Sequence, residues 1–290
     1  MGPLEEYCAA AFKSACIAEL EALKPGNVHI FADGHGMTAQ DFLRSAEAAA
    51  GPIARVESSV GERILHAIQA TYQAVGCNTN LGIVLLAAPI IKAANLEPTI
   101  PFKERIAKVL NNLSQQDAAH AFEAIRIASP AGLGQREKHD VSDQPQCTLL
   151  QAMVEANEYD YIAKQYANGY QELFLGLEHY QRLLQHWQRP AWAITGLYLH
   201  FLANYPDSHI ARKYGMEVSE KVKMQASEYE SAFLACENPK TYMPELLKWD
   251  ADLKSQAINP GTSADMTVSV ILLSDLLNNS SINSEEVAQK

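Results

Sequence analysis

The chain has 290 residues, of which 48% are hydrophobic and 20% are charged, and its formal net charge is −11 at neutral pH. This composition is ordinary for a globular protein, and the acidic balance disfavours a general surface for nucleic acid or anionic membranes. The five cysteines stand far apart and form no CxxC pair, so they indicate reduced thiols in a cytoplasmic protein rather than disulfides or structural zinc.

Apolar residues recur at helical spacing along nearly the whole chain, and no run of alternating β-branched residues stands out. Capping signals, such as Thr38 with Asp41 and Ser114 with Asp117, mark several helix starts. No apolar run is long enough to cross a bilayer, and the most apolar stretch, 81–94, is typical of a buried helix. The predicted helices cover residues 4–23, 38–51, 59–76, 81–94, 101–113, 114–128, 147–157, 159–188, 190–204, 207–235, 242–257 and 263–277.

These elements predict an all-α fold, a compact multi-helix bundle of about ten or more helices. We expect residues 1–277 to form a single all-helical catalytic domain and residues 278–290 to form a frayed polar tail. The segments 101–113 and 114–128 are typical of a helical hairpin. Residues 129–146 form the longest irregular segment, and its Gly, Pro, His and charged residues are typical of a binding loop.

Three short segments far apart in the chain, 24–29, 76–82 and 259–265, combine Gly, Asn, Pro, Ser and Thr beside long apolar helices. Gly allows positive φ and close backbone approach, and free N–H groups at turns that face helix starts suit phosphate. Together the three turns predict a single polyanion site, although each alone would also serve as an ordinary helix cap. The candidate phosphate- or substrate-binding residues on these turns are Lys24, Gly26, Asn27, Asn78, Thr79, Gly261 and Ser263.

Two further segments, 131–141 and 205–215, are polar where a helical bundle has no structural need of polarity. In the second, Asp207 is typical of a helix N-cap, and Arg212 and Lys213 follow about a turn and a half later. Basic residues near a helix N-terminus oppose the usual preference for acids, so they are expected to face an anionic ligand; a solvated basic pair is the alternative.

Carboxylates beside a phosphate site usually hold Mg²⁺, because hard oxygens suit a hard cation that bridges phosphate oxygens. Each acidic candidate could instead be a capping or first-turn residue. The candidates are Asp33, Asp41, Glu62 and Asp207 for the metal and Asp140 and Asp265 for catalysis, with Lys138 as a further phosphate ligand.

Several familiar site signatures are absent from the sequence. The chain has no dinucleotide-binding or P-loop glycine pattern and no HExxH or GxSxG motif. The nine histidines show no i,i+4 pair. His179 and His186 could share a helix face, but further ligands are missing, so we expect no zinc site there.

In order and spacing, these segments resemble the triphosphoribosyl-dephospho-CoA synthase family, from about residue 19 to residue 277. The resemblance lies in Lys-Pro-Gly-Asn-Val at 24–28, in 37–46, in Asn-Thr at 78–79 and in Asn-Pro-Gly-Thr-Ser-Ala-Asp at 259–265. It implies an all-helical enzyme that moves the 5-triphosphoribosyl group of ATP onto the ribose 2′-hydroxyl of dephospho-CoA and releases adenine. The product would be the precursor of the prosthetic group on the acyl carrier subunits of citrate lyase and malonate decarboxylase.

The resemblance implies a mechanism for these residues. ATP would bind through its triphosphate to the three turns, with one or two Mg²⁺ held by carboxylates. The glycosidic bond would break through an oxocarbenium-like transition state, and an acid would protonate the departing adenine. We expect Asp265 or Asp140 to be the base, Lys24, Arg212 and Lys213 to bind phosphate, Asn78 and Thr79 to orient the ribose or phosphate, and Gly261 and Ser263 to supply further donors.

The chain departs from the family pattern at the second turn, which usually reads Asn-Thr-His-Lys-Gly and here reads Asn-Thr-Asn-Leu-Gly at 78–82. His29 and Gly36 stand where Asp is usual. Later segments resemble a divergent branch, so a pterin or methanofuran cofactor precursor is an alternative acceptor. A non-catalytic nucleotide-binding protein is a second alternative. Apolar helices such as 193–202 could build either the core or a homodimer interface.

Overall fold

The computed structural model describes residues 2–129, 141 and 143–288, and in these residues it contains fourteen α-helices, one 3₁₀ helix and no strand. The prediction of an all-α fold is therefore confirmed. The elements are α1 Pro3–Glu21, α2 Ala39–Ala54, α3 Val60–Val75, α4 Leu81–Ala94, α5 Phe102–Asn111, α6 Gln115–Ala128, α7 Leu149–Ala156, α8 Tyr161–Ala167, α9 Gln171–Trp187, α10 Pro190–Asn204, α11 Ser208–Tyr214, α12 Met216–Leu234, η1 Pro239–Tyr242, α13 Met243–Ser255 and α14 Gly261–Ala288.

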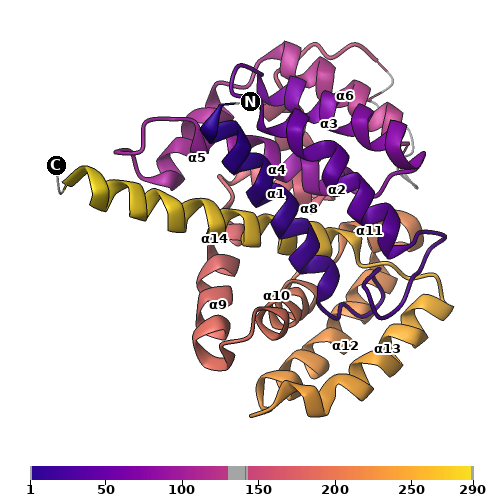
Figure 1. Ribbon diagram of the computed structural model, residues 1–290. Helices are drawn as coiled ribbons and strands as arrows, with labels where there is room; N and C mark the ends of the chain where they lie inside the picture. The colour runs from indigo at the N-terminus through magenta and orange to yellow at the C-terminus, as the bar shows by residue number, and fades with distance from the viewer. Residues whose placement is uncertain (1, 130–140, 142, 289–290) are drawn as a thin grey trace.

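The long C-terminal helix α14 organises the molecule. Helices α1 to α6 gather on one side of it and α9, α10, α12 and α13 on the other (Figure 1). It packs against α1, α4, α9 and α10, and one continuous hydrophobic core runs from α1 to α14. The backbone of α14 continues to Ala288, so it enters the segment 278–290, whose frayed character stays a prediction.

Several helix starts follow directly from the capping signals in the sequence. The hydroxyls of Thr38, Ser59 and Ser114 each accept a backbone N–H from the third residue of the helix that follows. The carboxylate of that third residue in turn accepts the backbone N–H of the cap, which completes a capping box. These local contacts fix where α2, α3 and α6 begin.

Four predicted elements differ from the structure. The segment 159–188 is two helices, because Gly169 and Tyr170 adopt left-handed conformations with φ of 71° and 66° between α8 and α9. The segment 207–235 is likewise interrupted at Gly215, where φ is 92°. Helix α2 continues through Pro52 to Ala54. The expected hairpin is not closely packed, because α5 packs on α4 while α6 packs mainly on α3.

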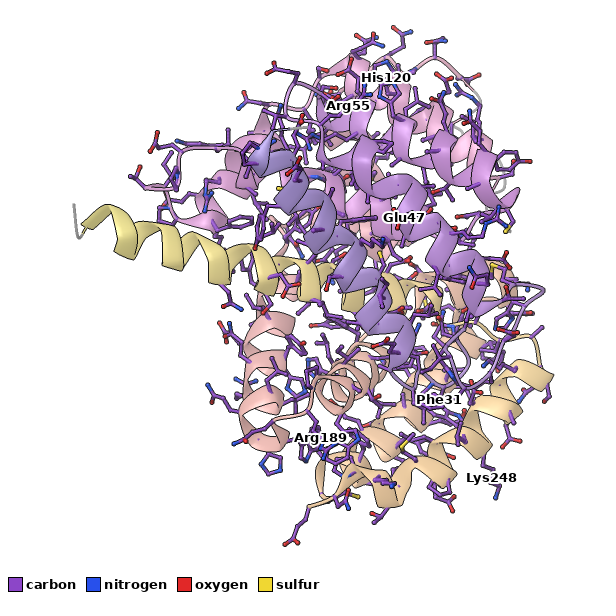
Figure 2. All side chains as sticks on the ribbon, viewed as in Figure 1. Phe31, Glu47, Arg55, His120, Arg189 and Lys248 are labelled. Atoms are coloured by element: carbon purple, nitrogen blue, oxygen red, sulfur yellow. The ribbon has the colours of Figure 1, made fainter. Side chains whose placement is uncertain are left out.

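The loop between α1 and α2 contacts α13. Phe31, on this loop, lies near α13 in Figure 2. Lys254 Nζ of α13 donates to Ala32 O at 3.0 Å, and Gly26 N donates to Asp250 Oδ1 at 2.8 Å. The first turn is therefore held next to the segment that leads into α14. None of the helices in the described chain has the length and apolarity needed to span a membrane.

Candidate active site

The three turns predicted from the sequence meet at one cavity of about 920 Å³. Asn27 lines it from the first turn, residues 76–82 from the second, and Asn259, Gly261 and Asp265 from the third. A volume of this order is typical of sites for nucleotide-sized ligands. The expectation that the distant turns share one site therefore agrees with the geometry.

The first and third turns are joined directly. Asn27 Nδ2 donates to Asn259 Oδ1 at 2.8 Å, and Asn27 Oδ1 accepts from Lys24 Nζ at 2.9 Å. Gly26 has φ of 83°, and a Cβ there would lie 2.8 Å from Pro260 Cδ, so only glycine allows this approach. Because Asp250 already takes the Gly26 amide, Gly26 has a structural role and does not line the cavity.

Asp265 lies in the first turns of α14 and faces the cavity from the third turn. Burial raises its pKa well above the usual range, and the negative charges of Asp207 and Glu19 add to the effect, while Arg212 opposes it. The carboxylate lies against Gly82 at the start of α4, where a Cβ would come within 2.0 Å of Asp265 Oδ2. A carboxyl group with a raised pKa in a cavity is suited to proton transfer.

Glu19 is a cavity residue that the sequence analysis missed. It lies on the last turn of α1, and its carboxylate accepts a hydrogen bond from Lys24, which is wholly buried behind it. Burial raises the pKa of Glu19 and lowers that of Lys24, and the attraction between the two opposes both shifts. Lys24 does not line the cavity and forms an ion pair with Glu19, and its contact with phosphate stays a prediction.

Helix α11 brings two cations to the cavity. Arg212 lines it and donates from Nη1 to Asp160 Oδ2 at 3.2 Å, while Lys213 lines it from an exposed position over the ring of Tyr214. These are the two basic side chains among the described residues of the lining, apart from histidines. The prediction that this pair faces a ligand site thus agrees with where the structure places it.

Two histidines, His35 and His209, also line the cavity, and neither was singled out from the sequence. His35 Nε2 donates to Gly26 O at 2.7 Å. Burial lowers the pKa of both imidazoles, and the charge of Lys213 lowers both further. His209 stood within the polar segment 205–215, which was the available signal for it.

The second turn ties the start of α4 to its neighbours. Asn78 Oδ1 accepts from Leu81 N at 3.1 Å, and Thr79 Oγ1 donates to Ser45 Oγ at 2.6 Å. Asn80 Nδ2 donates to Thr71 Oγ1 at 3.1 Å, whereas Asn80 Oδ1 is buried without a hydrogen-bond partner. All three polar residues of the turn line the cavity, so they combine a structural role with access to a ligand.

The four predicted metal carboxylates do not line the cavity within the described chain. Each instead accepts backbone N–H groups at helix starts, as the capping alternative expects, and a metal role for them stays a prediction. Asp207 accepts the most hydrogen bonds of the four. Its Oδ1 accepts from two amides of α11, and its Oδ2 accepts from the N and Oγ of Ser263. Ser263, bonded in this way, does not line the cavity either. For the others, Asp33 accepts from Ala39 N, Asp41 from Thr38 N and Glu62 from Ser59 N, at 2.8, 2.9 and 2.8 Å.

The predicted residues Lys138 and Asp140 lie outside the described residues. Ser129 and Val141, near the two ends of that segment, line the cavity. The two candidates therefore stay predictions.

An apolar wall faces the cavity from α2, α3, α6 and α7. Its members are Phe42, Tyr72, Phe122, Ile125 and Met153. Aromatic and aliphatic surfaces of this kind suit a planar heterocycle, whereas the polar turns and α11 suit phosphates.

A helical fold with a buried carboxyl group, two cations and an apolar wall around one cavity fits an enzyme that acts on a phosphorylated nucleoside. Residues 5–284 match the ATP:dephospho-CoA triphosphoribosyl transferase family, and the chain belongs to that family. It is therefore a transferase, as the resemblance implied.

A solved structure supports the same conclusion. The fold is similar to a crystal structure from Archaeoglobus fulgidus, provisionally named a triphosphoribosyl-dephospho-CoA synthase, with a TM-score of 0.63 and 25% identity over 80% of this chain and 96% of that one. A search of curated proteins found no significant match.

Proposed function

We propose that the protein transfers the 5-triphosphoribosyl group of ATP to the ribose 2′-hydroxyl of dephospho-CoA and releases adenine, in the cytoplasm. The family match over 5–284 supports the reaction class. The observation that carries the site assignment is the convergence of three distant turns and α11 on the cavity that Asp265 lines.

In this reaction the C1′–N9 bond of ATP breaks and a bond forms between C1′ and the acceptor oxygen. The negative charge of the ionised Asp265 carboxylate stabilises the cationic sugar of the oxocarbenium-like transition state, and the carboxylate takes the proton of the acceptor hydroxyl as the C1′–O bond forms. Arg212 and Lys213 bind the triphosphate, and the apolar wall holds adenine. Asn78 and Thr79 orient the ribose through side-chain hydrogen bonds.

Adenine leaves well only when a proton reaches its ring. His35 and His209 are the imidazoles of the described lining, and their lowered pKa values favour the neutral form in the free protein. The negative charge of bound triphosphate favours the protonated form, so ATP itself would prepare the acid.

Mg²⁺ is the ion that such a reaction uses with ATP, and Glu19 is the residue that fits it best. Glu19 lines the cavity, and its negative charge raises the pKa of Asp265, a repulsion that a divalent cation would relieve. Mg²⁺ commonly takes one or two carboxylates and completes its shell with phosphate oxygens and water. When bound, the ion would neutralise triphosphate charge.

Adenine formation tests this proposal. Wild-type protein is incubated with ATP and Mg²⁺, with and without dephospho-CoA, and the products are separated by liquid chromatography and weighed by mass spectrometry. We expect one adenine for each dephospho-CoA that gains a triphosphoribosyl group. ATP cleavage to ADP or AMP without adenine would contradict the proposal.

The residues of the second turn, 78–82, support a second candidate function, in which the acceptor is not dephospho-CoA. Leu81 and Asn80 stand where the family usually has Lys and His, and Asn80 Oδ1 lacks a partner. A pterin or methanofuran precursor with a free hydroxyl would use the same donor chemistry. Adenine release with such a precursor, and not with dephospho-CoA, would select this alternative, and no adenine with any acceptor would indicate a non-catalytic nucleotide-binding protein.

A further inference from the structure

The sequence shows no further ligands for His179, but the structure brings His200 and Glu230 next to it, and we propose that the three form a site for a transition-metal ion such as Zn²⁺. The three side chains come from α9, α10 and α12, and one potential ligand atom from each lies within 4.8 Å of the other two. None of them lines the large cavity. The site is therefore separate from the one that binds ATP, and it takes a different class of ion.

Hydrogen bonds account for only part of this cluster. His200 Nδ1 donates to Glu230 Oε1 at 3.0 Å, and Asn204 Nδ2 donates to His200 O at 2.9 Å. These contacts give His200 and Glu230 an ordinary structural role as a pair. They leave His179 unexplained.

His179 supplies the observation that points to a ligand. Its Nε2 is buried and has no hydrogen-bond partner, and its ring stacks on that of His200 with centroids 4.2 Å apart and planes 20° apart. Buried polar groups in native proteins nearly always have a partner. We therefore expect a bonding partner for the imidazole nitrogen of His179, which lies beside a second imidazole and a carboxylate. A metal ion satisfies all three groups together.

The donor set determines which ions fit. Two imidazoles and one carboxylate suit Zn²⁺ and, as probes of the same geometry, Co²⁺ or Ni²⁺, whereas Mg²⁺ prefers oxygen ligands throughout. Three protein ligands leave one tetrahedral position for water. When the ion binds, the stacked rings turn about their Cβ–Cγ bonds, and the proton between His200 and Glu230 leaves to solvent.

The position of the cluster suggests what the ion does. Helix α10 packs against both α9 and α12, so an ion held by all three helices would cross-link this layer. Helix α12 follows α11 directly at Gly215, and α11 carries Arg212 and Lys213. The ion would thus stabilise the layer that supports one wall of the cavity, without taking part in the transfer.

Co²⁺ titration of the full-length, chelator-treated protein tests the site, because tetrahedral Co²⁺ has intense visible absorption bands. His179→Phe keeps a ring to stack on His200 and removes the ligand nitrogens, and Glu230→Gln keeps a hydrogen-bonding group without the carboxylate. His186→Ala is the matched control, since His186 is an exposed histidine on the same helix.

We expect one Co²⁺ per chain, displaced by Zn²⁺, and a higher melting temperature with Zn²⁺. Each ligand variant should weaken binding by about 10-fold or more and abolish the thermal shift, whereas His186→Ala should change neither. Should His179→Phe fail to fold, Glu230→Gln decides alone. Absence of binding, binding that both ligand variants leave unchanged, or a thiolate-to-cobalt absorption band would each overturn the proposal.

Discussion

At the scale of single residues, Asp265 and Gly82 form the pair on which the account of the site depends. The sequence marks Asp265 because it ends the Asn-Pro-Gly-Thr-Ser-Ala-Asp segment at 259–265, one of the three special turns. It could not reveal that the carboxylate crosses to α4 and lies over Gly82. The sequence analysis missed Glu19 because its functional interest depends on its contact with Lys24 and on its place in the cavity lining. A helical pattern in the sequence shows neither of these.

Asp265→Asn should reduce turnover by about 10²- to 10⁴-fold, because the amide cannot accept the proton of the acceptor hydroxyl. The measurement is the initial rate of adenine release at saturating ATP, with circular dichroism to confirm the fold. Near wild-type activity in Asp265→Asn would show that Asp265 is not the base.

The same variant should be more stable than the wild type at neutral and alkaline pH. The pKa of Asp265 is raised in the folded protein, so its contribution to stability is full below the unfolded pKa and is lost as pH rises through the folded pKa. Asparagine stays neutral throughout. Urea unfolding across pH should show a free-energy difference that grows with pH; equal stability at every pH would contradict the raised pKa.

Gly82→Ala should abolish most activity while the fold survives, because the new Cβ would meet the Asp265 carboxylate at 2.0 Å and displace it. Gly51→Ala is the control, since it also lies in a helix and its Cβ would meet nothing within 4 Å. The control should keep its activity and gain a little helix stability. Equal activity in the two variants would exclude the close contact.

Lys213→Ala should raise the KM for ATP by about 10-fold with a smaller change in kcat, because a charge-assisted contact to phosphate would be lost. Lys221→Ala, on the exposed surface of α12, is the matched control. Steady-state kinetics in ATP provide the measurement. An unchanged KM in Lys213→Ala would remove Lys213 from the phosphate site.

At the scale of elements, the carboxylates predicted to bind metal accept hydrogen bonds at helix starts. Asp207 and Ser263 show how one residue can fit both roles in the sequence. A carboxylate close to a predicted phosphate site suggests a metal ligand, but the oxygens of Asp207 accept hydrogen bonds from α11 and α14. The prediction of one helix over 159–188 was wrong for a different local reason. The apolar period of the sequence continues across the left-handed turn at Gly169 and Tyr170, so the pattern does not show the break.

Asp207→Ala should lower the free energy of unfolding by about 2–5 kcal/mol, because it removes a buried carboxylate that accepts hydrogen bonds from the amides of His209, Ile210 and Ser263. Asp41→Ala, which removes an exposed capping contact, should have a much smaller effect on the free energy of unfolding. Denaturant unfolding compares the two. A similar small cost for both would show that the Asp207 contacts do not hold α11 to α14.

At the scale of the whole molecule, the cavity exists because α14 brings the third turn between the two groups of helices (Figure 1). The sequence could predict the all-α class and the presence of three special turns, since both are local signals. The meeting of the turns was inferred from their shared composition. The apolar wall and the two histidines could not be predicted, because they depend on which helix faces meet across the fold.

The most direct test of the site is a crystal structure of Asp265→Asn with ATP, Mg²⁺ and dephospho-CoA. The account predicts ATP in the cavity, with its triphosphate within hydrogen-bond distance of Arg212 and Lys213, its ribose beside residue 265 and adenine against the apolar wall. ATP bound outside this cavity, or inside it with the ribose away from residue 265, would contradict the account.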